Sequence, residues 1–169
     1  MQLLIGLGGN RGDVAAAFAA AVAGLAHEVA VLARSSLWRS APLGPPQPDY
    51  LNAAVLVDAP CHPRALLALC RRLEEAGGRD RARESRWGPR PLDLDLLIAP
   101  GLAMLGAEVE LPHPRLAERR FALEPAAELA PDWMHPRSGL TLRRLALEPS
   151  VAAQRCERVA TAASWGDSR

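Results

Sequence analysis

The segment from Leu92 to Ile98, LDLDLLI, places two aspartates inside an apolar run. The alternation is that of a β-strand, in which successive side chains point to opposite faces. Asp93 and Asp95 are therefore expected to share one face, with the leucines between them on the other. Cα atoms two positions apart on a strand are separated by roughly 7 Å. Like charges this close beside a core are costly unless positive charge neutralises them, so the segment predicts either basic partners or a metal ion.

The chain as a whole has the size of one domain with its own core, 169 residues. The formal net charge of +1 provides no field that would attract nucleic acid or a membrane surface. Every basic side chain is arginine, which excludes a Walker-type phosphate loop because that loop needs a lysine. The three cysteines show no CxxC spacing, which indicates reduced thiols in a cytoplasmic protein. The N-terminal apolar run is short and lacks a basic region before it, so we expect neither a signal peptide nor a membrane span.

Hydrophobic periodicity and turn residues predict the element order β-α-β-β-α-β. We expect strands over 2–7, 28–39, 51–57 and 92–98, and helices ending near Ala26, Glu75 and Leu129, the first capped by Asp13. This order is typical of an α+β ferredoxin-like sandwich, an antiparallel sheet with helices packed on one face. Residues 1–149 are predicted to form the single domain. Residues 150–169 are small and polar, which predicts a loosely ordered tail.

The two aspartates have two interpretations, a Mg²⁺ site or a pair of surface carboxylates matched to arginines. Mg²⁺ prefers oxygen ligands and is usually held by one or two carboxylates plus substrate phosphates. Five arginines precede the strand: Arg79, Arg81, Arg83, Arg86 and Arg90. They form either a solvated loop or a phosphate clamp, because guanidinium groups match phosphate oxygens. Metal-binding carboxylates beside arginines are the recurring equipment of phosphoryl transfer.

Three other stretches are candidates for a binding site. In PLGPPQPDYLNAAV, Tyr50 and Asn52 point the same way along a strand, and an asparagine amide suits the hydrogen-bonding edge of a flat heterocycle. Tyr50 either packs on such a ring or belongs to the core. GLGGNRGD lacks the spacing of a dinucleotide fingerprint, so we interpret it as a tight turn between strand and helix. In LPHPRLAERRF, His113, Arg119 and Phe121 either face a ligand or serve the fold.

Taken together, four stretches resemble the 6-hydroxymethyl-7,8-dihydropterin pyrophosphokinases in order and spacing. They are GLGGNRGD, SSLWRSAPLGPPQPDYLNAAV, RWGPRPLDLDLLI and LPHPRLAERRFALEPAAELAPD, and the resemblance covers about residues 2 to 145. It implies an ATP-dependent enzyme of folate biosynthesis. Such an enzyme transfers diphosphate from ATP to the hydroxymethyl group of the pterin and releases AMP.

The resemblance also implies a role for each matching residue. Asp93 and Asp95 would bind two Mg²⁺ ions, with Asp95 nearest the attacking hydroxyl, while Arg81 and Arg90 would balance the charge of the transferred group. The implied pterin site is Ser40, Ala41, Leu43, Tyr50, Asn52, Trp87 and Phe121. The implied ATP site is Glu74, Arg81, Trp87, Arg90, His113 and Arg119, with Trp87 on a loop that closes over the site.

The sequence departs from the family pattern in four places. Gly9 stands where the family often has serine, Ser40 and Ala41 where it has Thr-Pro, and Arg71 where some members have glutamine. The loop between Glu74 and Trp87 is one residue longer than in some members, which makes the Arg81 assignment the least direct.

Two other functions fit parts of the pattern. A metal-dependent phosphohydrolase would use the same carboxylates, but it needs an activated water, and the sequence offers no further carboxylate or histidine cluster for one. A non-catalytic RNA-binding module needs exposed aromatic residues on its sheet, and these strands carry Leu, Val and Ala instead. We therefore expect ATP and a small pterin as ligands, no nucleic acid or membrane partner, and a cytoplasmic monomer.

Overall fold

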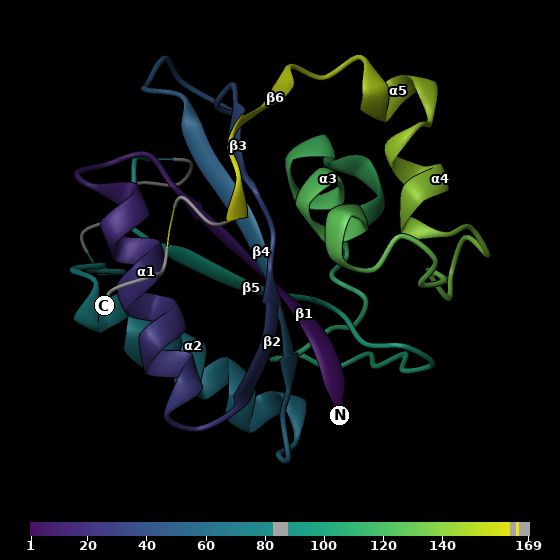
Figure 1. Ribbon diagram of the computed structural model, residues 1–169, viewed down its shortest axis with the longest axis horizontal. Helices are drawn as coiled ribbons and strands as arrows, with labels where there is room; N and C mark the ends of the chain where they lie inside the picture. Colours follow the sequence, from purple (N-terminus) through teal and green to yellow (C-terminus); the bar gives the residue numbers. More distant parts are fainter. Residues whose placement is uncertain (83–87, 163–164, 166–169) are drawn as a thin grey trace.

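The sheet that carries the two aspartates has six strands, seen in a computed structural model that describes residues 1–82, 88–162 and 165 (Figure 1). The strands are β1 (Gln2–Gly9), β2 (Ala30–Arg34), β3 (Leu37–Ser40), β4 (Tyr50–Asp58), β5 (Asp93–Ile98) and β6 (Cys156–Ala160). The helices are α1 (Val14–Ala26), α2 (Pro63–Ala76), α3 (Arg120–Leu129), α4 (Leu142–Ala146) and α5 (Pro149–Ala152), with a 3-10 turn η1 (Leu116–Glu118). None of the described helices is both long and apolar enough to cross a membrane.

The strand order is β5-β1-β4-β3-β6, and β2 pairs with β4 beside β3. The paired strands run antiparallel, which confirms the predicted α+β class with an antiparallel sheet. The strand expected over 28–39 is divided into β2 and β3 at Ser35 and Ser36. The division has a local cause, because side chains take part in the hydrogen bonding of these backbone groups. Ser35 Oγ accepts from Ala54 N at 2.8 Å, and Ser36 N donates to Glu128 Oε1 at 3.0 Å.

Helices cover both faces of the sheet, so the prediction that they pack on one face is wrong (Figure 1). One core joins α1 and α2 to the sheet through residues such as Phe18, Leu66 and Leu94. A second core joins α3 and α4 to the opposite face. The reason lies in the strands, which present apolar side chains such as Leu4 and Ile98 to that second face as well. An apolar face of this kind must be buried against another element.

The two helices of the first core begin where the sequence predicts. Asp13 caps α1, since its Oδ1 accepts from Ala16 N at 3.0 Å. Pro63 stands in the first turn of α2, where its missing N–H has no cost. The turn between β1 and α1 is the tight connection expected for GLGGNRGD, and Gly12 within it has a φ of 74°.

The described part of the chain from Pro149 onward, residues 149–162 and 165, adds a strand to the sheet. It contains α5 and β6, and β6 pairs with β3 from Leu37 to Ser40. Trp165 is 4% exposed, its ring lies 5.8 Å from that of Phe18, and its Nε1 donates to Ser35 O at 2.9 Å. The segment Cys156–Ala160 extends the sheet here because the edge of β3 supplies backbone partners.

Candidate active site

The floor of the site is the row formed by three strands around Gly8 on β1. Gly8 is opposite Asp93 on β5 and opposite Asn52 on β4, so the three residues share one face of the sheet. A Cβ at Gly8 would lie 3.8 Å from Asn52 Oδ1 and 3.9 Å from Asp93 Cβ. Gly6, two residues earlier on β1, is opposite Asp95 on β5. Two glycines thus leave a trough between the aspartates and the asparagine.

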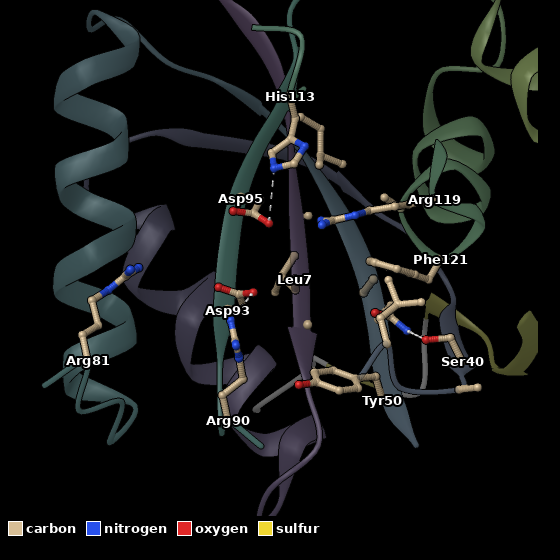
Figure 2. A pocket seen from close by; sticks show the side chains of 18 residues that line it. Leu7, Ser40, Tyr50, Arg81, Arg90, Asp93, Asp95, His113, Arg119 and Phe121 are labelled. Atoms are coloured by element: carbon tan, nitrogen blue, oxygen red, sulfur yellow. Dashed lines mark hydrogen bonds and ion pairs between the residues drawn. The ribbon is translucent and has the colours of Figure 1, made fainter. Parts of the chain in front are cut away.

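This trough opens into a cavity of about 530 Å³ on the face that α3 covers only in part. Predicted site residues from five separate segments line it: Ser40, Ala41, Leu43, Tyr50, Asn52, Arg81, Arg90, Asp93, Asp95, His113, Arg119 and Phe121. Figure 2 shows the aspartates on one side of β1 and the Ser40 and Phe121 side chains on the other. The segments lie far apart in sequence, and the sheet register brings them together. Trp87, Arg83 and Arg86 fall outside the described residues.

Asp93 is neutralised from below by an arginine that the sequence did not distinguish from its neighbours. Arg79 is 7% exposed and donates to Glu74 at 2.6 Å and to Asp93, while Arg90 Nη1 donates to Asp93 Oδ2 at 3.1 Å. Burial alone would raise the pKa of Asp93, but Arg79 and Arg90 hold it below its ordinary value. Asp93 therefore stays ionised at neutral pH.

Glu74 lies beneath the cavity rather than in its lining. It is 1% exposed, it accepts from Leu94 N at 2.8 Å, and it forms ion pairs with Arg79 and Arg81. A direct contact between Glu74 and a nucleotide would require both arginines to leave it. In this structure its carboxylate fixes the start of β5 and the two arginines instead. The sequence signal for this structural role of Glu74 was an acidic residue within the apolar pattern of a helix that is followed by Arg79 and Arg81.

Asp95 is the less neutralised of the two aspartates. Its enclosure in the cavity, and then the charge of Asp93, raise its pKa to about 7. His113 Nε2 lies 3.9 Å from Asp95 Oδ2, and His113 N donates to Leu97 O at 2.7 Å. Burial, and then Arg119, lower the pKa of His113, so the imidazole is neutral at pH 7. Asp93 and Asp95 thus form a pair of neighbouring carboxyl groups, of which Asp95 is partly protonated at neutral pH. A cation bound beside them would supply the positive charge that Asp95 lacks.

The other half of the cavity suits a flat ring. Asn52 is 4% exposed, and its Nδ2 donates to Trp38 O at 3.2 Å and to Ser40 Oγ at 3.0 Å. Both amide hydrogens are thereby committed, and Oδ1 is left toward Gly8 as an acceptor. Phe121 stands on α3 with the Arg119 guanidinium 5.6 Å from its ring centre, and Tyr50 Oη donates to Gly88 O at 3.2 Å.

Asn10 is a positioning residue that sequence reasoning missed. Its backbone N–H donates to Arg90 O and its Oδ1 accepts from Arg90 N, both at 2.9 Å. Its Nδ2 donates to Gln47 Oε1 and to Pro48 O, both at 3.0 Å. The turn after β1 therefore ties the arginine segment to the proline-rich loop before Tyr50. The asparagine in GLGGNRGD is the signal, although asparagine in a turn usually serves only the turn.

The geometry defines a class of protein, an α+β ferredoxin-like domain that places paired carboxylates and several arginines beside a slot for a ring. Among the described residues, no three acidic, histidine or cysteine side chains gather closely enough to hold a metal unaided. Two carboxylates that share a cation with phosphate oxygens are the arrangement that Mg²⁺ usually takes. Arginines and a neutral histidine beside them are suited to binding a phosphorylated ligand.

Comparison with known proteins agrees with this class. Residues 4–131 match the sequence model of the family described as 7,8-dihydro-6-hydroxymethylpterin-pyrophosphokinase (HPPK). The chain belongs to this family. It is 42% identical over 144 residues to the 2-amino-4-hydroxy-6-hydroxymethyldihydropteridine pyrophosphokinase of Synechocystis, covering 84% of this chain and 73% of the relative. It is 45% identical over 131 residues to the enzyme of the same name from Methylorubrum extorquens, covering 76% and 82%.

Solved structures support the fold. The wild-type HPPK-DHPS of Plasmodium falciparum, crystallised with STZ-DHP, matches with a TM-score of 0.67 at 11% identity, over 86% of this chain. This chain spans 42% of that solved chain. The family resemblance and the predicted activity, ATP-dependent pyrophosphoryl transfer to hydroxymethyldihydropterin in folate biosynthesis, are confirmed at the level of the family. The phosphohydrolase and RNA-binding alternatives are not favoured.

Proposed function

We propose that this chain transfers the terminal diphosphate of ATP to the hydroxymethyl oxygen of 6-hydroxymethyl-7,8-dihydropterin. The oxygen attacks the β-phosphorus, its bond to phosphorus forms as the bond to the AMP oxygen breaks, and the hydroxyl proton is released to solvent. The observation that carries the proposal is the row Asp93, Gly8 and Asn52, in which a carboxylate and an amide lie on either side of a floor without a side chain. The two substrates would meet above that floor.

Asp93 and Asp95 are the residues that would hold two Mg²⁺ ions, together with phosphate oxygens of ATP. Their fit rests on the donor set, because both are carboxylates on one strand and Asp95 lies open to the cavity with a side chain that is 44% exposed. Bound Mg²⁺ would supply charge neutralisation to the attacking and leaving oxygens. Asp95 would lie nearest the attacking hydroxyl and would help to orient it.

Arginines would receive the phosphates. Arg90, whose Nη1 donates to Asp93 at 3.1 Å, would exchange that carboxylate for phosphate oxygens once a cation neutralises Asp93. Arg81 would act similarly from the margin of the cavity, anchored through Glu74. Arg119 and His113 would contact the triphosphate from the opposite side. Catalysis would consist of positioning and charge balance without a covalent intermediate.

The pterin would lie in the slot between Phe121 and Tyr50. Asn52 Oδ1 would accept from an N–H group on the edge of the ring, because its own N–H groups already donate to Trp38 O and Ser40 Oγ. Ser40 thereby orients Asn52, and Ala41 and Leu43 would close the pocket beside it. Trp87 would act from the segment outside the described residues. We further propose a cytoplasmic monomer that binds neither nucleic acid nor membranes.

The test is AMP release from ATP and Mg²⁺ with and without the pterin. The proposed transfer requires AMP only when the pterin is present, in equal amount to the pterin consumed. AMP or ADP formed at the same rate without the pterin would identify a hydrolase instead. Omission of Mg²⁺ should abolish the reaction, because Asp93 and Asp95 then have no cation through which to hold the phosphates.

A further inference from the structure

The connection from α5 into β6 contacts three separate walls of the cavity. We call residues 154–156 the strap; they lie beyond the part of the chain that matches the family model, which ends at residue 131. We propose that the strap positions the ring-binding end of the cavity and that Gln154 and Arg155 are positioning residues for pterin binding. The identity of the ligand as a pterin rests on the proposed function, whereas the contacts of the strap are observed in the structure.

The first wall is the start of α3, which Gln154 caps from a distance. Gln154 Oε1 accepts from Arg120 N at 3.1 Å, and its Nε2 donates to Glu118 O at 2.7 Å. Arg120 is the first residue of α3, so its N–H has no partner within the helix, and no side chain at Arg119 caps it. Gln154 therefore fixes the backbone on both sides of Arg119, directly before Phe121.

The Arg120 side chain in turn donates hydrogen bonds to backbone carbonyl groups of the strap and of the residues before it. Its Nη1 donates to Ala152 O at 2.8 Å and to Gln154 O at 3.0 Å, and its Nε donates to Glu124 at 2.9 Å. Donors and acceptors thus run in both directions between α3 and the strap. Figure 1 shows the chain from α5 to β6 passing over the α3 end of the molecule and then alongside β3.

The second wall is the proline-rich loop, and the third is the end of β3. Arg155 Nη2 lies 2.7 Å from Asp49 Oδ2, and Asp49 directly precedes Tyr50. Cys156 is opposite Ser40 in the β3–β6 register, and Ser40 Oγ accepts from Asn52. The strap therefore links the segments that carry Phe121, Tyr50 and Asn52. Among the described residues, the hydrogen bonds and ion pairs of the strap run to α3, to the proline-rich loop and to β3, away from Asp93 and Asp95.

Gln154, Arg155 and Cys156 each contact a different wall of the proposed pterin slot. These contacts would fix the width of the slot before the pterin binds. Binding costs less when the walls are already in place, because fewer side chains and loops must be ordered on association. Loss of a strap contact should therefore weaken pterin binding more than ATP binding. The buried Trp165 and the β6 pairing keep the strap attached, so single substitutions within it leave the fold in place.

The test compares Arg155→Ala and Gln154→Ala with Arg72→Ala in the full chain. The control removes another exposed arginine pair of the same length, Arg72 with Glu28 at 2.7 Å, remote from the cavity. Each strap variant should raise the pterin KM about fivefold, the change that corresponds to one hydrogen bond of average strength. Arg155→Ala should leave the ATP KM and kcat within about twofold, and Arg72→Ala should change none of these values. The double exchange Asp49→Arg with Arg155→Asp should restore the pterin KM.

A second readout does not depend on activity. Amide hydrogen exchange at Arg120 should accelerate in Gln154→Ala, because that N–H loses its acceptor, while exchange in α1 stays unchanged. Faster exchange with an unchanged pterin KM would overturn the proposal and leave the strap a purely structural element. Unchanged exchange would overturn it as well. A wild-type chain without pterin-dependent AMP release would contradict the proposed function, and the exchange measurement would still decide whether the strap holds α3.

Discussion

Arg79 and Asp93 form an ion pair under the floor of the cavity, where the Arg79 side chain is 5% exposed and also donates to Glu74 at 2.6 Å. One buried guanidinium thus serves two carboxylates, one structural and one open to the ligand site. This arrangement answers half of the problem set by two aspartates in an apolar strand. Arginine neutralises Asp93, while the pKa of Asp95 is raised to about 7 by burial and then by the charge of Asp93.

Arg79→Ala is expected to destabilise the protein strongly. The substitution leaves Glu74 and Asp93 as buried carboxylates without their shared partner, and breaking such a pair from one side costs about 3–5 kcal/mol. Urea unfolding of the variant measures the loss. The exposed pair of Arg72 with Glu28 provides the control, since Arg72→Ala should cost less than about 1 kcal/mol. Equal costs for the two variants would mean that Arg79 has no special role.

Gly8→Ala and Gly12→Ala should separate binding from stability. A methyl group at Gly8 meets Asn52 and Asp93 only at ordinary contact distances, so the strand should form normally. The methyl fills the floor, however, and the pterin KM should rise about tenfold. Gly12 has a φ of 74° and no neighbour within 4 Å, so alanine there should cost about 1–2 kcal/mol of stability and leave KM unchanged. Steady-state kinetics and thermal unfolding of both variants give the comparison, and a Gly8→Ala enzyme with normal KM would contradict the proposed floor.

Mg²⁺ binding should weaken as the pH falls below about 7. Enclosure in the cavity, and then Asp93, raise the pKa of Asp95 to about 7 in the metal-free protein, and a metal binds the ionised carboxylate. Below that pH the ion must displace a proton, so affinity falls with pH, while above it affinity is level. Asp93 does not contribute to the pH dependence of Mg²⁺ binding in this range. Burial would raise its pKa, but Arg79 and Arg90 keep that pKa below its ordinary value. Titration calorimetry of the nucleotide-free protein with Mg²⁺ should show affinity about tenfold lower at pH 6 than at pH 8. Equal affinities would place the metal elsewhere.

Asp95→Asn should reduce kcat about a thousandfold or more while the protein stays folded. The amide keeps the shape of the carboxylate but removes the charge that the cation and the phosphates require. Asp132→Asn is the matched control, because the Asp132 side chain is 82% exposed and lies 3.5 Å from Arg143 in a surface pair. Circular dichroism verifies the fold of both variants. Turnover near the wild-type rate in Asp95→Asn would remove Asp95 from the reaction.

Local patterns in the sequence were sufficient to predict most elements. The alternation around Asp93 and Asp95 predicted β5 and its polar face, and Asp13 and Pro63 marked the starts of α1 and α2. These signals depend on neighbours within a few residues. The position of Asn52 beside the aspartates was reached only through the family resemblance, because it depends on the register of two strand pairs.

The features that were missed depend on long-range contacts. Strand β6 forms because the edge of β3, more than a hundred residues earlier, accepts it. Arg79 and Arg81 look alike in the sequence, and only the buried position of Glu74 separates the buried arginine from the half-exposed one. The layer formed by α3 and α4 could be predicted only if both faces of the sheet were known to be apolar.

The most direct test of the proposed reaction is ³¹P nuclear magnetic resonance of the products formed from ATP, Mg²⁺ and 6-hydroxymethyl-7,8-dihydropterin. Attack at the β-phosphorus predicts AMP and a diphosphate ester of the pterin in equal amounts, with none formed by Asp95→Asn. ADP with a pterin monophosphate, or inorganic phosphate released without any pterin ester, would contradict the proposed transfer.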